Sequence, residues 1–288
     1  MNSMNIKQTL ELFLRRLYWY PGHYYSPLPS IKEIKQQKEL FASDVDSVPG
    51  VDLQYERQME FLKECQQYYD ELPFHEKEEK QQRYYFENNM YSYADGIFYY
   101  FMLRTIKPRR VIEVGSGYTS ALLMDVNEKY LSSNTQMCFI EPYTERLKKL
   151  LRKSDKVRIL ENKLQDVELK VFKSLKAGDI LFIDSTHVVK TGSDVNYIFS
   201  KILPVLQEGV YVHFHDIFYP FEYPREWVMT GRAWNEDYML RSFLQYNHTF
   251  EIVLWNHYLI AQNPTWFREH MPLCLKNSGG SIWLKKVR

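Results

Sequence analysis

Short apolar runs and longer segments with helical spacing alternate along most of this chain. The apolar runs have the length of strands and lie at Arg110–Val114, Gln136–Ile140, Val157–Leu160, Ile180–Ile183, Val210–Phe214, Glu251–Trp255 and Ser281–Lys285. Between the first five runs, helical spacing is found at Thr119–Tyr130, Thr144–Leu151, Val167–Leu175 and Asp194–Gln207. Strands that alternate with helices in this way predict an α/β fold with a mostly parallel, doubly wound sheet.

The first part of the chain has helical spacing without strand-like runs. We predict helices over residues 5–20, 30–41, 52–71 and 92–106. The second begins at a capping box of Ser30 and Glu33, and the fourth at a cap formed by Ser92 with Asp95. Residues 1–88 are therefore predicted to be a helical extension that precedes the α/β domain.

Three stretches have no periodic pattern. In the extension, His23–Pro29 combines aromatic residues with prolines, which suits either a surface connection or a lid over a substrate pocket. Within the α/β domain, residues 89–288, the segment Ile217–Trp234 is a long connection crowded with aromatic residues. The segment from residue 256 to Gly279–Gly280 is expected to be polar and irregular.

Composition argues against several classes of partner and compartment. The 288 residues include 37 basic and 36 acidic side chains, and this balance argues against a nucleic-acid or anionic-membrane partner. The three cysteines lie far apart without a C-x-x-C pair, which favours a reducing cytoplasm over a disulfide framework or zinc finger. Charges within Leu10–Leu17 argue against a signal peptide, and no apolar run approaches the roughly 20 residues that span a bilayer. We therefore expect a cytoplasmic protein, and the sequence leaves its oligomeric state open.

The stretch Val111–Ser120 combines a buried strand, a glycine turn and the start of a helix. Gly115 and Gly117 let the backbone turn sharply and approach a ligand without an intervening side chain. The helix that follows directs its free N–H groups and positive dipole end at the same place. Glu141, 24 residues past Gly117, lies where an acid can hold both hydroxyls of a ribose. This pattern suits nicotinamide cofactors and S-adenosylmethionine alike.

Polar or glycine residues follow five successive predicted strands. They are Gly115–Gly117, Glu141, Asp166, Asp184–His187 and His215–Asp216. Because ligands of open parallel sheets bind outside the carboxyl ends of the strands, we expect these residues to form one shared site.

Over about residues 90–288 the chain resembles the class I S-adenosylmethionine-dependent methyltransferases. The successive motifs of that class are matched in order by Glu113–Gly117, Glu141, Gln165–Asp166 and Ile183–Asp184. The segment Gly279–Val287 resembles the last, antiparallel strand of the fold, which implies a seven-stranded Rossmann-like sheet. Ile183–His187 and Phe214–Ile217 are most similar to bacterial small-molecule O-methyltransferases, a group that includes enzymes of polysaccharide and antibiotic pathways.

The resemblance implies a role for each matched residue. Cofactor-binding residues would be Glu113, Gly115, Ser116 and Gly117 for the methionine part, Glu141 for the ribose, and Gln165 with Asp166 for the adenine edge. Asp184 would lie near the methionine amino group and the transferring methyl. In metal-dependent members, an acid after the fourth strand and an acidic or amide pair after the fifth bind magnesium. Here that pair is His215–Asp216, and because magnesium prefers oxygen ligands, the use of a metal stays open.

Methyl transfer to a hydroxyl needs a group that takes the hydroxyl proton. His187 and His215 follow strands at the expected edge, and the usual pKa of histidine lies near neutral pH. With Asp184 and Asp216 they are the predicted catalytic residues, and a histidine base would make the rate rise through about pH 6 to 7. The predicted acceptor is a small molecule or a sugar, methylated by in-line transfer.

Other functions share part of this pattern. An NAD(P)-dependent Rossmann oxidoreductase would use the same glycine turn and Glu141, but it leaves the acids after the later strands unexplained. A non-catalytic S-adenosylmethionine-binding protein would bind the cofactor without turnover. A non-haem iron site of two histidines and a carboxylate usually requires another scaffold.

Overall fold

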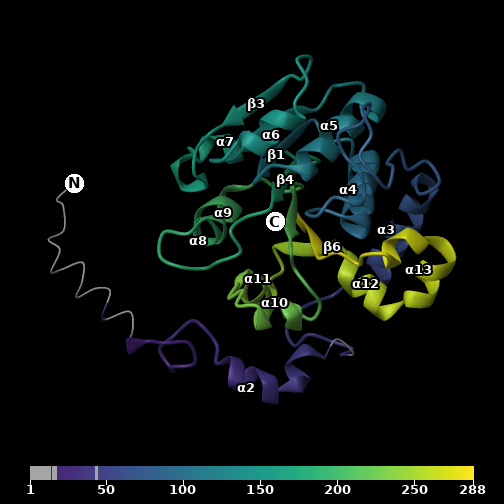
Figure 1. Cartoon of the computed structure of the whole chain (residues 1–288). Helices are drawn as coiled ribbons and strands as arrows, with labels where there is room; N and C mark the ends of the chain where they lie inside the picture. The colour runs from purple at the N-terminus through teal and green to yellow at the C-terminus, as the bar shows by residue number, and fades with distance from the viewer. Residues whose placement is uncertain (1–13, 15–17, 43–44) are drawn as a thin grey trace, which may run out of the picture.

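The computed structural model describes residue 14, residues 18–42 and residues 45–288 (Figure 1). Most of the helix predicted over residues 5–20 lies outside the described residues. None of the helices in the described part of the chain has the length and apolar character that crossing a bilayer requires.

Seven strands form one sheet in the order β3-β2-β1-β4-β5-β7-β6. Their bounds are β1 Arg110–Val114, β2 Gln136–Ile140, β3 Val157–Leu160, β4 Ile180–Ile183, β5 Tyr211–His215, β6 Phe250–Trp255 and β7 Ser281–Lys286. Strands β1 to β5 pair in parallel, whereas β7 lies between β5 and β6 and is antiparallel to both. The predicted seven-stranded Rossmann-like sheet with an antiparallel last strand is therefore confirmed.

Helices flank the sheet and fill most of the connections between its strands. They are α2 Ile31–Gln36, α3 Tyr55–Cys65, α4 Tyr93–Ile106, α5 Tyr118–Tyr130, α6 Glu145–Leu150, α7 Lys170–Lys173, α8 Asp194–Tyr197, α9 Leu203–Val205, α10 Arg225–Met229, α11 Glu236–Leu244, α12 Asn256–Gln262 and α13 Pro264–His270. A π-helical turn at Ile198–Ile202 joins α8 to α9. Helices α3, α4, α12 and α13 gather beside the sheet (Figure 1).

Strands β1 and β4 lie in the middle of the sheet, and nearly all of their residues are buried. All four residues of β4 are buried, as are the last four of β1, which is typical of strands covered on both faces. Strand β1 pairs with β2 on one side and with β4 on the other. The strand order therefore reverses at β1, and in open α/β sheets the crevice at such a reversal is where ligands bind.

Two sequence predictions for local structure are wrong. The stretch after residue 256 is not irregular, because it forms α12, α13 and a 3₁₀ turn at Pro272–Leu275. Asn263 caps α13 by accepting a hydrogen bond from the Trp266 N–H, and Pro264 occupies the first helical position. Asp95 does not cap α4, since its carboxylate is turned toward other elements and the Ser92 hydroxyl donates to the Phe86 carbonyl instead.

The described part of the extension packs onto the α/β domain, and two of its contacts bear on the site. Gln58 of α3 accepts a hydrogen bond from the Trp255 N–H at 2.7 Å, which ties α3 to the end of β6. Ile34 and Phe41 pack against an aromatic cluster built around Phe218 in the connection after β5. That cluster forms part of the wall of the site described next.

Candidate active site

A cavity of about 740 Å³ lies at the carboxyl ends of β1, β4 and β5. A neighbouring groove of about 410 Å³ shares Gly115, Glu141, Asp184, Ser185 and Thr186 with it. Both volumes are within the range of small-molecule sites. The crevice predicted from the strand ends is therefore present, and it has two connected compartments.

Gly115 turns the chain at the end of β1 in a way that a side chain would prevent. Its φ is +79°, and a Cβ built on it would lie 2.1 Å from the carbonyl oxygen of Asp184. The Asp184 N–H donates to the Val114 carbonyl at 2.8 Å, so the two strand ends are held together. The absent side chain lets β1 and β4 meet at the floor of both compartments.

Glu113 lies beneath this turn and lines neither compartment. One carboxylate oxygen accepts hydrogen bonds from the hydroxyls of Thr119 and Ser120, and the other has no partner among the described residues. Burial raises the pKa of Glu113 to about 8, against the opposing effect of the two hydroxyls. In this structure, Glu113 fixes the first turn of α5, and the Ser120 hydroxyl also accepts from the Gly117 N–H at 3.2 Å.

Glu141 stands on the wall that the two compartments share. Its carboxylate accepts hydrogen bonds from the N–H groups of Ser116 at 3.2 Å and Tyr143 at 2.7 Å. Gln165 lines the groove and donates to the Gly192 carbonyl at 2.7 Å. Asp166, in contrast, is exposed and is not part of the groove wall.

The four predicted catalytic residues meet at the inner end of the larger cavity. His187 Nε2 lies 3.4 Å from Asp184 Oδ1 and 3.7 Å from Asp216 Oδ2. His215 Nδ1 lies 3.3 Å from Asp184 Oδ1, and its Nε2 lies 3.6 Å from Asp216 Oδ1. Two imidazoles therefore alternate with two carboxylates.

His187 and Asp216 both have left-handed backbone conformations, with φ of +58° and +57°. Strained non-glycine residues of this kind cluster at functional sites.

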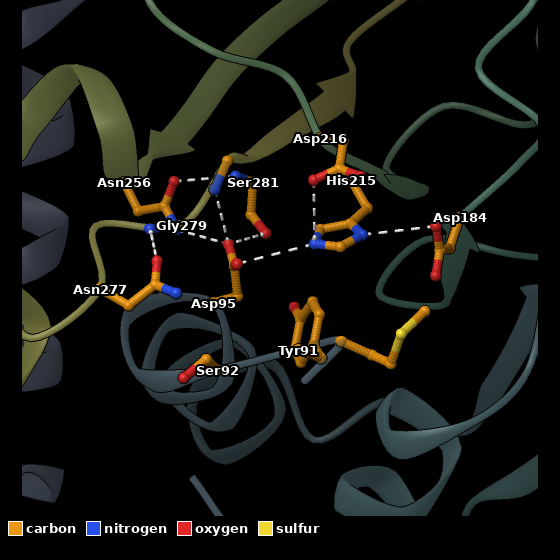
Figure 2. Close-up of polar contacts among 12 residues, drawn as sticks. Tyr91, Ser92, Asp95, Asp184, His215, Asp216, Asn256, Asn277, Gly279 and Ser281 are labelled. Atoms are coloured by element: carbon orange, nitrogen blue, oxygen red, sulfur yellow. Dashed lines mark hydrogen bonds and ion pairs between the residues drawn. The ribbon is translucent and has the colours of Figure 1, made fainter. Parts of the chain in front are cut away.

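Asp95 is a member of this cluster that the sequence analysis missed (Figure 2). Its buried carboxylate accepts hydrogen bonds from Asn256 Nδ2 at 2.8 Å, the Gly280 N–H at 3.0 Å and the Ser281 hydroxyl at 2.5 Å. Its other oxygen lies 3.6 Å from His215 Nε2. Asp95 thus links α4, α12 and the start of β7 to the imidazole at the end of β5.

Glu236, in the first turn of α11, is the second residue that the sequence analysis missed. It lies 2.8 Å from His187 Nδ1 and also accepts from the Ser185 hydroxyl. The His187 ring packs on Trp234, with 4.4 Å between the ring centroids. His187 is therefore enclosed by carboxylates on both nitrogens and by an indole on one face.

The expectation that a histidine here has a near-neutral pKa is wrong for both candidates. Burial alone would lower the pKa of His187, but hydrogen bonds to Asp184 and Glu236 raise it to about 10. Burial also opposes protonation of His215, but the charges of Asp216 and Asp184 raise its pKa well above the usual range. These shifts favour the protonated form of both imidazoles, in which neither ring can accept a proton.

The pKa values of Asp184 and Asp216 are shifted in opposite directions. Burial opposes ionisation of Asp184, but the two imidazolium charges outweigh it and lower the pKa of Asp184. Burial also raises the pKa of Asp216, and there it exceeds the opposing effect of His215 and His187. Asp216 is therefore a stronger base than an ordinary aspartate.

The residues at this end of the cavity do not fit a magnesium site. Both ring nitrogens of His187 and His215 already face carboxylate oxygens, whereas magnesium takes a shell of oxygen ligands. Across the described ranges, no group of three or more histidine, cysteine or acidic side chains has an arrangement that could hold a metal ion.

Comparison with known proteins gives matches at the level of sequence and of fold. Residues 112–217 match a family described as a methyltransferase domain. The chain is 32% identical over 165 residues to an uncharacterized protein of Archaeoglobus fulgidus, covering 56% of this chain and 75% of the relative. The SAH-bound methyltransferase PaMTH1 of Podospora anserina is similar with 12% identity and a TM-score of 0.44, covering 91% of this chain and 98% of that one. A putative methyltransferase of Thermobifida fusca is similar with 12% identity and a TM-score of 0.42, covering 67% and 79%.

Proposed function

Because the chain belongs to the family of the archaeal relative and carries a methyltransferase domain, we propose that it transfers the methyl group of S-adenosylmethionine to a hydroxyl of a small molecule or sugar. The observation that supports this most is the pair of connected compartments at the reversal of the sheet. One compartment has the residues that suit a nucleoside, and the other contains a carboxylate of raised pKa.

The residues of the groove fit S-adenosylmethionine. The side-chain-free backbone at Gly115 leaves room for a ligand beside Asp184, and the Glu141 carboxylate on the shared wall is placed to accept from ribose hydroxyls. Gln165 would contact the adenine, and the turn Gly115–Gly117 would contact the methionine part. When bound, this cofactor supplies an electrophilic methyl group on a sulfonium.

We assign the proton transfer to Asp216. Its carboxylate lies between His187 Nε2 and His215 Nε2, at 3.7 and 3.6 Å, so the two imidazolium groups hold it in place. An acceptor hydroxyl that donates to Asp216 would be oriented and relieved of its proton as the methyl group is transferred. Asp184, whose lowered pKa keeps it ionised, holds both imidazoles from the cofactor side.

Glu141→Ala should weaken binding of S-adenosylmethionine by more than about tenfold. The substitution removes two hydrogen bonds between the ribose hydroxyls and a charged acceptor. Titration calorimetry with S-adenosylhomocysteine measures the effect, and Glu208→Ala, at an exposed acid away from both compartments, is the control. Equal affinity of wild type and Glu141→Ala would contradict the ribose assignment.

The same titration separates the alternative functions. Binding of NAD or NADP in place of S-adenosylhomocysteine would favour the oxidoreductase. Cofactor binding without transfer of labelled methyl to any member of a panel of nucleotide sugars and phenols would favour a non-catalytic protein.

The turnover rate should fall as the pH passes about 10. The His187 pKa, raised from 6.5 to about 10, keeps its imidazolium intact until then. The same shift contributes stability that is complete below about pH 6.5 and is lost as the pH rises through about 10. Rate profiles and thermal unfolding in the same buffers measure both effects. A rate that stays level through pH 10 would contradict a role for the His187 imidazolium.

A further inference from the structure

The charged groups at the two ends of the larger cavity differ in how they are paired. At the inner end, Asp95, Asp184 and Asp216 lie against His187 and His215. At the outer end the wall is formed by Trp227, Arg232 and Trp234.

The guanidinium of Arg232 is held in place by two indole rings. Its central carbon lies 4.1 Å from the ring centroid of Trp227 and 5.1 Å from that of Trp234. The two indoles are themselves packed edge to face, with centroids 5.3 Å apart, and the backbone N–H of Arg232 donates to the Trp227 carbonyl at 3.1 Å. Ile34 and Phe41 pack against the same aromatic cluster from outside. The cation is therefore anchored from several directions.

No side chain in the described part of the chain forms an ion pair or hydrogen bond with this guanidinium. A guanidinium that rests on aromatic faces still has its N–H donors at the edge, in a fork that matches a carboxylate or phosphate. Arg232 thus presents unused donors to a cavity that the reaction also uses.

The position of Arg232 relative to the reacting end sets the orientation of a ligand. The Trp234 ring contacts both groups, since its centroid lies 5.1 Å from the guanidinium carbon and 4.4 Å from the ring centroid of His187. At the inner end the nitrogens of His187 and His215 already face carboxylate oxygens, so no unpaired cation is left there for an anionic group. A free cation at one end only therefore favours a single orientation of an anionic ligand.

We propose that the methyl acceptor carries an anionic group, a carboxylate or a phosphate, that Arg232 binds while the acceptor hydroxyl faces Asp216. This inference rests on the proposed methyl transfer and names the class of its acceptor. Arg146, which also lines the cavity, lies at the glycine turn on the cofactor side, 3.3 Å from the position of a Cβ on Gly117. It is therefore suited to a different part of the site.

Matched acceptors test the proposal through activity. One set is 3,4-dihydroxybenzoate and its neutral amide, and the other compares neutral methyl glucoside with glucuronate and with glucose 1-phosphate. We expect kcat/KM to be about tenfold or more higher for an anionic acceptor than for the neutral one in at least one set, because the added bonds are charge-assisted. Arg232→Gln should bring that ratio to within about threefold, whereas Arg268→Gln, at an exposed site outside the cavity, should leave it unchanged. Preference for the carboxylate or the phosphate member identifies the anionic group.

Binding provides a readout that does not depend on turnover. Benzoate and inorganic phosphate, titrated separately into the full chain, should change the tryptophan fluorescence saturably in the wild type and in Arg146→Gln but not in Arg232→Gln. If no acceptor is methylated while this difference is found, the proposed methyl transfer fails and the anion site stands. Equal responses of wild type and Arg232→Gln to both probes, or a ratio of kcat/KM that Arg232→Gln leaves unchanged, would overturn the proposal.

Discussion

Asp216→Asn should lower the turnover of methyl transfer by about 100- to 10,000-fold and leave the affinity for S-adenosylmethionine within about threefold, the range typical of losing a general base. The amide has nearly the shape of the carboxylate, but it cannot take a proton and does not attract His187 and His215. Initial rates with labelled methyl donor, together with calorimetric titration of the cofactor product, separate the two effects. A parallel loss of cofactor affinity would place Asp216 in cofactor binding instead.

Asp237→Asn is the matched control. Asp237 is also buried and lies in the neighbouring helix α11, but it lines neither compartment. Its Oδ1 accepts from the Phe218 N–H at 3.2 Å, a bond that an asparagine oxygen preserves. This variant should therefore keep its turnover within a small factor of wild type.

Treatment of the wild type with EDTA tests whether Asp216 acts without a metal. Unchanged turnover would support this mechanism, and inhibition that magnesium reverses would contradict it.

The strand bounds were predictable because the central strands are buried on both faces. A segment such as Ile180–Ile183 must be apolar at every position when helices cover both sides of the sheet, and this leaves an unbroken apolar run in the sequence. The polar residues that end those runs were predictable as one site for a related reason. Parallel strands bring all their carboxyl ends to one edge, whatever the length of the connections.

The two short helices after β6 were missed although a local signal was present. Asn263 followed by Pro264 is an N-cap followed by the residue favoured at the first helical position. Each helix has only seven residues, too few for a periodic apolar pattern to emerge from a mostly polar segment. The polar composition of the stretch therefore led to a prediction of irregular structure, although the Asn263–Pro264 capping pattern indicates the start of a helix.

The electrostatics of the site depend on contacts that no spacing in the sequence reveals. Asp95 has the offset from Ser92 that a capping partner would have, and only the arrival of β7 beside α4 turns it toward His215. Glu236 lies 49 residues after His187, and no spacing in the sequence links the two. Because these carboxylates raise the pKa of both imidazoles, the strand ends predicted that the four residues meet but not the protonation state of either histidine.

Gly115→Ala should abolish measurable cofactor binding, a loss of about 100-fold or more, and should lower the free energy of unfolding by about 3 kcal/mol. Two effects add at this position. The backbone has φ of +79°, which costs an alanine about 1 kcal/mol, and the new Cβ would lie 2.1 Å from the Asp184 carbonyl oxygen. Because that oxygen belongs to the backbone at the end of β4, it can move only by displacing Asp184 itself. Denaturant unfolding and titration with S-adenosylhomocysteine measure the two consequences.

Gly178→Ala separates backbone strain from the clash. Gly178 has a φ of +84°, close to that of Gly115, but a Cβ built on it would meet nothing within 4 Å. It lies in the turn before β4, at the end of the sheet opposite the cavity, where its N–H donates to the Gly209 carbonyl. This variant should lose only the roughly 1 kcal/mol of the left-handed conformation and should bind the cofactor as wild type does. Equal stability and equal cofactor affinity of the two variants would contradict the explanation that position 115 requires glycine because β1 and β4 are in close contact there.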